Sequence, residues 1–136
     1  MRAVLDANIL IAALLSSGGP PAQIVSRWLA GDFELVVSEA LLAELARALA
    51  YAKVQKHIPE APGRAFVTLL RESAVVAPDA AEPARRSADR DDDYLLALAE
   101  SANAVLVSGD KHLLELAGEL PVQTARAFLQ TLEQAR

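Results

Sequence analysis

Four acidic residues from separate parts of the chain border apolar runs or interrupt one: Asp6, Glu44, Asp92 and Asp110. Carboxylates that converge on one place raise one another's pKa values unless a cation lies among them. Mg²⁺ and Mn²⁺ prefer oxygen ligands, so a carboxylate cluster without cysteine or histidine suits them. A cation held in this way polarises a phosphodiester and activates a bound water. The pattern therefore predicts a Mg²⁺ or Mn²⁺ site that acts on a phosphate ester.

Each of these residues also has a purely structural interpretation. Asp6 suits a helix N-cap, Asp110 suits a turn, and Asp92 suits a first helical turn, where the helix dipole favours a negative charge. Glu44 suits a solvated helix surface. However, Glu44 lies on the same apolar stripe as Leu41, where an unpaired carboxylate is costly. That position favours a functional role for the glutamate.

Three consecutive aspartates occupy positions 91–93, directly before the apolar run of a helix. We prefer Asp92 as the site residue because Leu95, Leu96 and Ala99 follow it at offsets of three, four and seven. These offsets place it on the apolar face of the expected helix. Asp93 is the competing register and a candidate auxiliary ligand.

The elements that must position these residues alternate along the chain. We expect strands at 3–5, 33–38, 74–78, 104–110 and 121–125, and helices at 8–17, 20–30, 39–54, 62–73, 91–102, 111–118 and 126–136. The strands are short apolar runs, which is typical of a parallel sheet covered on both faces. The predicted fold is therefore α/β, a three-layer α/β/α sandwich with a central, mainly parallel sheet.

The sheet explains how distant acids could meet. Ligands of open α/β sheets bind beyond the carboxyl ends of the strands. Asp6 and Asp110 each follow an expected strand, and Asp92 opens the helix that leads into the second of these strands. Glu44 can join them if its helix packs over the same edge.

Length and composition limit the remaining possibilities. With 136 residues the chain is expected to form one domain, residues 1–136. The net charge of −5 argues against a dedicated duplex-DNA-binding protein, and the absence of cysteine excludes thiolate sites and disulfides. No apolar run is long enough to cross a membrane. Because Asp6 and Asn8 interrupt the apolar start, we interpret it as folded structure and expect a cytoplasmic location.

Four motifs together resemble a known family. The segments "AVLDANILIAALL", "SEALLAEL", "DRDDDYLLALA" and "VLVSGDKHLLEL" are similar to the motifs of PIN-domain ribonucleases. Among these, the chain looks most like the single-domain, VapC-type toxins of toxin–antitoxin systems. Each motif alone is weak, but the set covers essentially the whole chain in the usual order and spacing.

This resemblance implies an acidic quartet around Mg²⁺ or Mn²⁺ that cleaves RNA phosphodiesters with a metal-activated water. The matching positions are Asp6, Glu44, Asp92 and Asp110, with Asp93 as the rival for the third position. It also implies an RNA substrate, a cognate antitoxin protein and a homodimer.

Two polar residues near the quartet receive supporting roles from the same resemblance. Asn8 belongs to the D-x-N signature and is expected to orient Asp6 through hydrogen bonds. Ser108 precedes the Gly-Asp turn and is expected to assist the metal or phosphate site.

Basic residues flank the acidic motifs on both sides. Arg85, Arg86 and Arg90 precede the aspartates, and Lys53 and Lys56 follow the glutamate helix. These side chains are candidate contacts to RNA phosphates. An equally good interpretation is that they are solvated surface charges.

Other functions remain open from the residues alone. Haloacid-dehalogenase-like Mg²⁺ phosphatases also place an aspartate after the first strand, but they need a second aspartate where this chain has Asn8. Receiver domains use an acidic pocket with a lysine, such as Lys111, but they pair two acids after the first strand. A catalytically silent PIN-fold binding module would be expected to lack at least one acid of the quartet, and none is lacking.

Overall fold

In the computed structural model, residues 1–85 and 92–135 are described. The strands are β1 (Arg2–Leu5), β2 (Glu34–Val37), β3 (Val75–Val76), β4 (Val105–Val107) and β5 (Val122–Gln123). The helices are α1 (Ala7–Leu15), α2 (Pro20–Leu29), α3 (Glu39–Leu49), α4 (Ala52–Gln55), α5 (Glu60–Ser73), α6 (Asp93–Ser101), α7 (Lys111–Leu114) and α8 (Ala125–Gln134). Strands and helices alternate in the order expected from the sequence.

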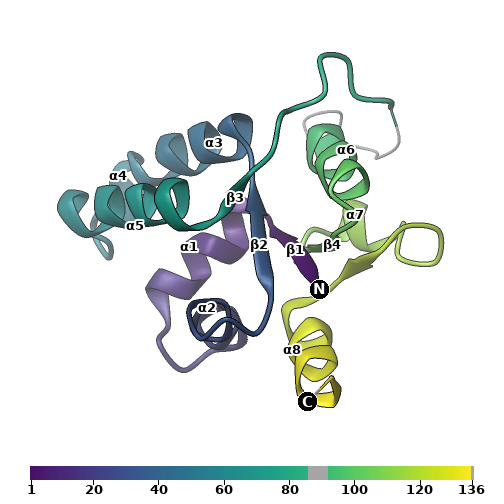
Figure 1. Cartoon of the computed structure of the whole chain (residues 1–136). Coiled ribbons are helices and arrows are strands. Elements are labelled where there is room, and N and C mark those ends of the chain that lie inside the picture. Colours follow the sequence, from purple (N-terminus) through teal and green to yellow (C-terminus); the bar gives the residue numbers. More distant parts are fainter. Residues whose placement is uncertain (86–91, 136) are drawn as a thin grey trace.

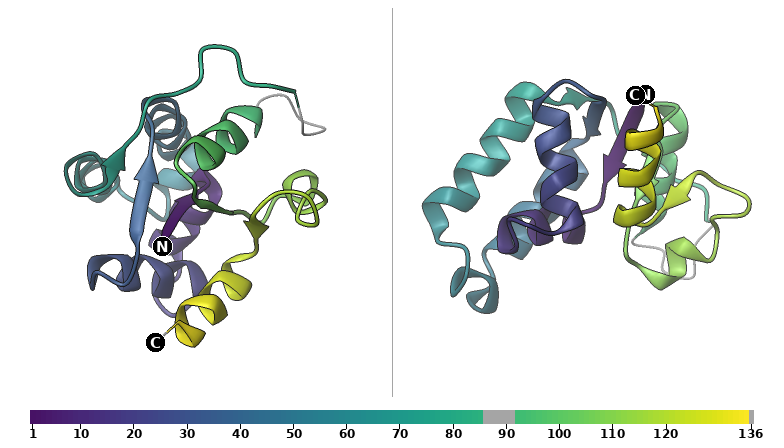
Figure 2. Two further views of the ribbon diagram at one scale, coloured as in Figure 1. Left: turned by 45° about the vertical axis from the view of Figure 1, so that its right-hand side comes forward. Right: turned by 90° about the horizontal axis from the view of Figure 1, so that it is seen from below.

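The five strands form one parallel sheet in the order β3-β2-β1-β4-β5. Helices α3, α4 and α5 lie on one side of β1, and α6 lies on the other (Figure 1). The views in Figure 2 show the same separation, with α8 on the side of α6. The predicted α/β sandwich with a central parallel sheet is therefore confirmed.

The strand order reverses between β1 and β4. From β1 the chain proceeds outward through β2 to β3, then returns to add β4 and β5 on the opposite side of β1. Successive right-handed crossovers place the helices of the two halves on opposite faces. The chain thus leaves β1 and β4 in different directions, and α/β proteins commonly bind ligands beyond the carboxyl ends of such a strand pair.

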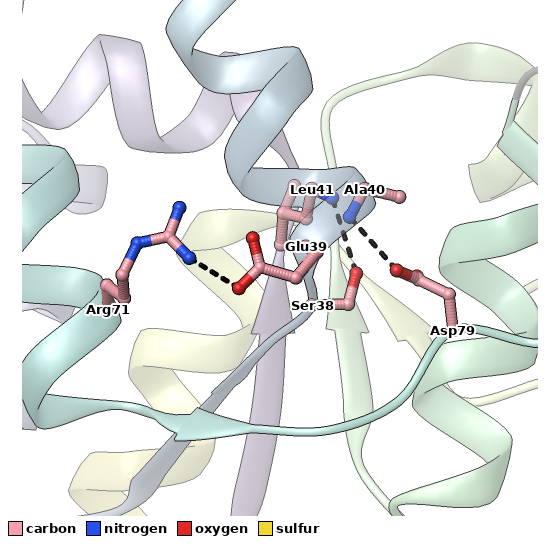
Figure 3. A network of polar contacts seen from close by, with 6 residues as sticks. All are labelled: Ser38, Glu39, Ala40, Leu41, Arg71 and Asp79. Carbon is pink, nitrogen blue, oxygen red and sulfur yellow. Dashed lines mark hydrogen bonds and ion pairs between the residues drawn. The ribbon is translucent and has the colours of Figure 1, made fainter.

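The helix expected over residues 39–54 is divided in two, which corrects that prediction. α3 ends at Leu49, and Tyr51 adopts an extended conformation before the short α4. After Leu49 the side chains at 50–53 are exposed, so no apolar stripe remains to hold a continuous helix against the core. Farther along, α5 packs on α3, and Arg71 forms a surface ion pair with Glu39 (Figure 3).

The core extends from the sheet into the helices on both faces. Phe128 of α8 is fully buried, and its ring meets that of Phe33 edge-to-face, with centroids 5.2 Å apart. This contact joins the C-terminal helix to the start of β2. Among the described residues, no helix alone is long and apolar enough to cross a membrane. The pair α1 and α2 meets that condition only jointly, across a bend of 97°.

The Phe33–Phe128 contact makes a testable prediction about the last helix. Replacing Phe128 with alanine should lower the free energy of unfolding by about 3–5 kcal/mol, because it leaves a large cavity in the core. Leu29→Ala is the control, since that side chain is 57% exposed and its loss should cost about 0.5 kcal/mol or less. Urea unfolding measures both. Equal effects would show that α8 does not belong to the cooperative core.

Candidate functional site

Asp6 lies at the point where β1 passes into α1. Its backbone N–H donates to the carbonyl of Val107 over 3.1 Å, which continues the pairing of β1 with β4. Its carboxylate caps α1 by accepting the N–H of Ile9 over 2.9 Å. The side chain is only 6% exposed. The structural role expected for a lone aspartate here is thus present, but a cap does not require burial.

Ser108 connects the two strand-end aspartates. Its hydroxyl donates to the Asp6 carboxylate and accepts the backbone N–H of Asp110 over 2.9 Å. The Asp110 carboxylate in turn accepts the N–H of His112 over 2.8 Å and caps α7. Ser108 is completely buried, so these contacts fix the turn after β4 against the end of β1.

Glu44 is carried by α3, whose first turn is held by two oxygen acceptors. Ser38 accepts the N–H of Leu41 over 3.3 Å, and Asp79 accepts the N–H of Ala40 over 2.9 Å (Figure 3). These bonds satisfy backbone donors that a helix start leaves unpaired. They also fix the direction of α3, which places Glu44 half-buried, as expected from its position on the apolar stripe.

Tyr94 of α6 donates a hydrogen bond from its phenol to the Glu44 carboxylate. The pKa of Tyr94 is raised far above its ordinary value by burial first, then by the bond to Glu44 and by the charges of Glu44, Asp79 and Asp92. The phenol therefore remains a neutral hydrogen-bond donor among acidic side chains. Sequence reasoning missed this residue, although a tyrosine beside the aspartates in an otherwise apolar helical run was an available signal.

The start of α6 brings the third acidic position to the same end of the sheet. α6 packs against β1 and β4. Asp92 is half-buried, and Asp93 is 4% exposed. The predicted apolar face is present, because Leu95, Leu96 and Ala99 are all buried. Both aspartates are thus placed near the carboxyl ends of these strands, and the choice between them stays a prediction.

Asp6 lies within electrostatic range of two other acids, Glu44 and Asp110. Burial is the main cause that raises its pKa. The bonds from Ser108 and Ile9 oppose the shift, and the charges of Glu44 and Asp110 add to it. In the part of the chain that the structure describes, none of these three carboxylates forms an ion pair. Among the described residues, the repulsion that Glu44 and Asp110 exert on Asp6 is therefore not offset by an ion pair with a basic side chain.

The candidate carboxylate ligands suit a hard divalent cation by their chemistry. As they are placed, however, their side chains are not close enough together to hold one. All the candidate ligands are carboxylate oxygens, which Mg²⁺ and Mn²⁺ prefer. Within the described ranges, no three histidine or acidic side chains stand close enough to hold a metal ion as they are placed.

The structure bears on the predicted roles of Asn8 and of the basic residues in different ways. Asn8 is exposed and makes no hydrogen bond with Asp6, so its predicted orienting role is wrong. The bonds come from Ser108 and Ile9 instead, since Asn8 lies on the outer side of the first turn of α1.

The side chains of Arg85, Lys53 and Lys56 are exposed, as a phosphate contact requires. Arg86 and Arg90 lie outside the described residues.

The raised pKa of Asp6 predicts how stability depends on pH. Because the folded-state pKa lies above the usual 3.8, the folded protein binds this proton more tightly than the unfolded chain. Ionisation therefore costs stability, in full above the folded pKa and not at all below the unfolded value. Asp6→Asn keeps an oxygen to cap α1 and removes that cost. In EDTA at neutral pH it should raise the melting temperature by a few degrees, about 3 °C per kcal/mol.

This gain should shrink as the pH falls toward 3.8, the usual pKa of an aspartate. Glu119→Gln is the matched control, because it removes an exposed charge and should leave the melting temperature unchanged at every pH. A lower melting temperature for Asp6→Asn at neutral pH in EDTA would refute the repulsion described here.

Comparisons with solved structures show the same fold in three other proteins. VapBC-1 from nontypeable Haemophilus influenzae shares 22% identity over 93% of this chain and 99% of that chain, with a TM-score of 0.61. VapBC2 from Rickettsia felis, bound to a promoter DNA fragment, shares 15% over 91% and 98%, with a TM-score of 0.61. FitAcB from Neisseria gonorrhoeae shares 16% over 91% and 98%, also with a TM-score of 0.61.

No curated protein matches the chain in sequence. A family model described as the PIN domain, however, matches residues 2–112, a segment that contains all four acids of the expected quartet. The match favours this family over the phosphatase and receiver alternatives. The chain therefore belongs to the PIN domain family.

Proposed function

We propose that this chain is a Mg²⁺- or Mn²⁺-dependent endoribonuclease and the toxin of a toxin–antitoxin pair. One observation carries the proposal: the buried Asp6, at the end of β1, is under the charges of Glu44 and Asp110, and none of the three has a basic partner among the described residues. In a PIN domain, whose toxin members are generally nucleases, such a cluster is best explained as a cation site for phosphodiester hydrolysis.

Each residue has a defined part in this proposal. Asp6, Asp110 and one of Asp92 and Asp93 would hold the cation, and Glu44 would add a ligand or hold the attacking water. When bound, the cation supplies polarisation of the phosphoryl group and a more acidic water. Ser108 would keep the two strand-end carboxylates in place through the bonds described above. The carboxylates must approach more closely than they do here, at a cost in repulsion that the cation offsets.

Exposed basic side chains give the proposed RNA a place to bind. Lys53 and Lys56 lie on and just after α4, and Arg85 lies in the segment before α6. Together with Arg86 and Arg90, they are proposed to contact phosphates, which fixes the position of the strand without reading its sequence.

The proposed partners follow from the family resemblance. VapBC structures share the fold, so we propose a cognate antitoxin protein for this chain as well. A homodimer and a cytoplasmic location complete the proposal.

RNA cleavage in Mn²⁺ and in EDTA tests the function. Wild-type protein should cut RNA with Mn²⁺ or Mg²⁺ and not with EDTA. Asp6→Asn and Asp110→Asn should each reduce the rate by at least about 100-fold, because loss of a ligand exceeds the usual effect of losing an outer contact. Glu119→Gln, which removes an exposed charge, should cut at the wild-type rate. Asp92→Asn and Asp93→Asn in the same series identify the third ligand by the larger loss.

Cleavage that persists in EDTA would contradict the metal-dependent mechanism. Turnover of a small phosphomonoester without RNA cleavage would favour the phosphatase alternative. Mn²⁺ binding without cleavage of any RNA would favour a catalytically silent binding module.

The phosphate contacts predict a change in salt dependence. For single-stranded RNA, the logarithm of the binding constant falls with the logarithm of the salt concentration by about 0.7 for each phosphate contact. The double variant Lys53→Ala with Lys56→Ala should therefore reduce this slope by about 1.4. RNA binding to a cleavage-deficient Asp110→Asn background, titrated over a range of salt, measures it. An unchanged slope would assign both lysines to the solvated surface.

A further inference from the structure

We infer that Tyr94 is a positioning residue that orients the Glu44 carboxylate for the cation site. The inference rests on the proposed function and adds to it a residue outside the acidic quartet. Its basis is a hydrogen bond between side chains 50 positions apart, donated by the phenol of Tyr94 to Oε2 of Glu44. The two helices that carry these residues, α6 and α3, stand on either side of β1 (Figure 1).

The hydrogen-bond donor to Glu44 is a neutral phenol, although its surroundings are acidic side chains. Tyr94 is half-buried, and the charges of Asp79 and Asp92 act on it in addition to that of Glu44. A basic side chain in this place would neutralise the acids and compete with a cation. A phenol supplies one hydrogen-bond donor without any positive charge. It can therefore hold a carboxylate still while it leaves the negative charge of the cluster intact.

The bond leaves one oxygen of Glu44 available. Oε2 is held by Tyr94, and among the described residues Oε1 accepts no hydrogen bond from the protein. A glutamate side chain has three rotatable bonds, and fixing it in one arrangement costs conformational entropy. Hydrogen bonds that orient ligating carboxylates remove this cost before the metal binds, and their loss typically weakens metal binding or activity by about 10–100-fold.

Tyr94→Phe tests the inference, because it removes the hydroxyl and keeps the ring. The matched control is Tyr51→Phe at the other tyrosine of the chain, which is 64% exposed. Mn²⁺ binding, measured by electron paramagnetic resonance without RNA, should weaken by about 10-fold in Tyr94→Phe. kcat for RNA cleavage should fall by about the same factor, whereas KM for RNA stays within about twofold. Tyr51→Phe should match wild type in all three measurements.

A double-mutant cycle separates positioning from a merely structural role. If Tyr94 acts through Glu44, adding Tyr94→Phe to Glu44→Gln should weaken Mn²⁺ binding by less than twofold beyond Glu44→Gln alone. Additive losses, or wild-type Mn²⁺ binding by Tyr94→Phe, would overturn the inference and leave the proposed function standing. Wild-type protein that neither binds Mn²⁺ nor cleaves RNA would overturn both.

Discussion

The parallel pairing of β1 with β4 determines where the charged groups of the site can lie. Leu5 pairs with Val107, so the next residues, Asp6 and Ser108, come side by side at the end of the sheet. The strand order reverses at this pair, and open α/β sheets commonly bind ligands beyond the carboxyl ends of the strands at such a point. Burial of the core on both faces makes a slip of this register costly, because every strand side chain would change face. The position of the acids is thus a consequence of the same packing that stabilises the sheet.

Among the described residues, no basic side chain pairs with Asp6, Glu44 or Asp110 to reduce their repulsion. Asp6 is buried near two other carboxylates, and its stabilising contacts are neutral donors: the Ser108 hydroxyl and the Ile9 N–H. Glu44 is likewise held by the neutral phenol of Tyr94. Neutral donors reduce the cost of burying each charge and preserve the negative potential that the proposed cation site requires. An arrangement of this kind is more readily explained by function than by stability, since an uncompensated buried charge weakens a fold.

Much of this site could be predicted from the sequence, because the residues that mark strand ends and apolar stripes are local features. Asp6 and Asp110 follow strands, and Glu44 interrupts an apolar stripe, so their placement required no knowledge of distant contacts. The Tyr94–Glu44 bond could not be predicted in the same way, because it depends on how α6 and α3 pack across β1. Asn8 illustrates the opposite error. Its motif position predicted that its side chain orients Asp6, but in the first turn of α1 this residue is exposed and does not bond to Asp6. The division between α3 and α4 was missed because alanine-rich sequence favours helix on both sides of the break.

The central claim is that carboxylates from β1, α3, α6 and the turn after β4 hold one cation site. Anomalous X-ray diffraction from crystals of the wild-type protein grown with Mn²⁺ tests this claim most directly. The predicted result is an anomalous peak bonded to carboxylate oxygens of Asp6 and Asp110, with Glu44 and one of Asp92 and Asp93 within coordination distance of the ion or its waters. A peak at other residues, or no peak at these carboxylates at saturating Mn²⁺, would contradict it.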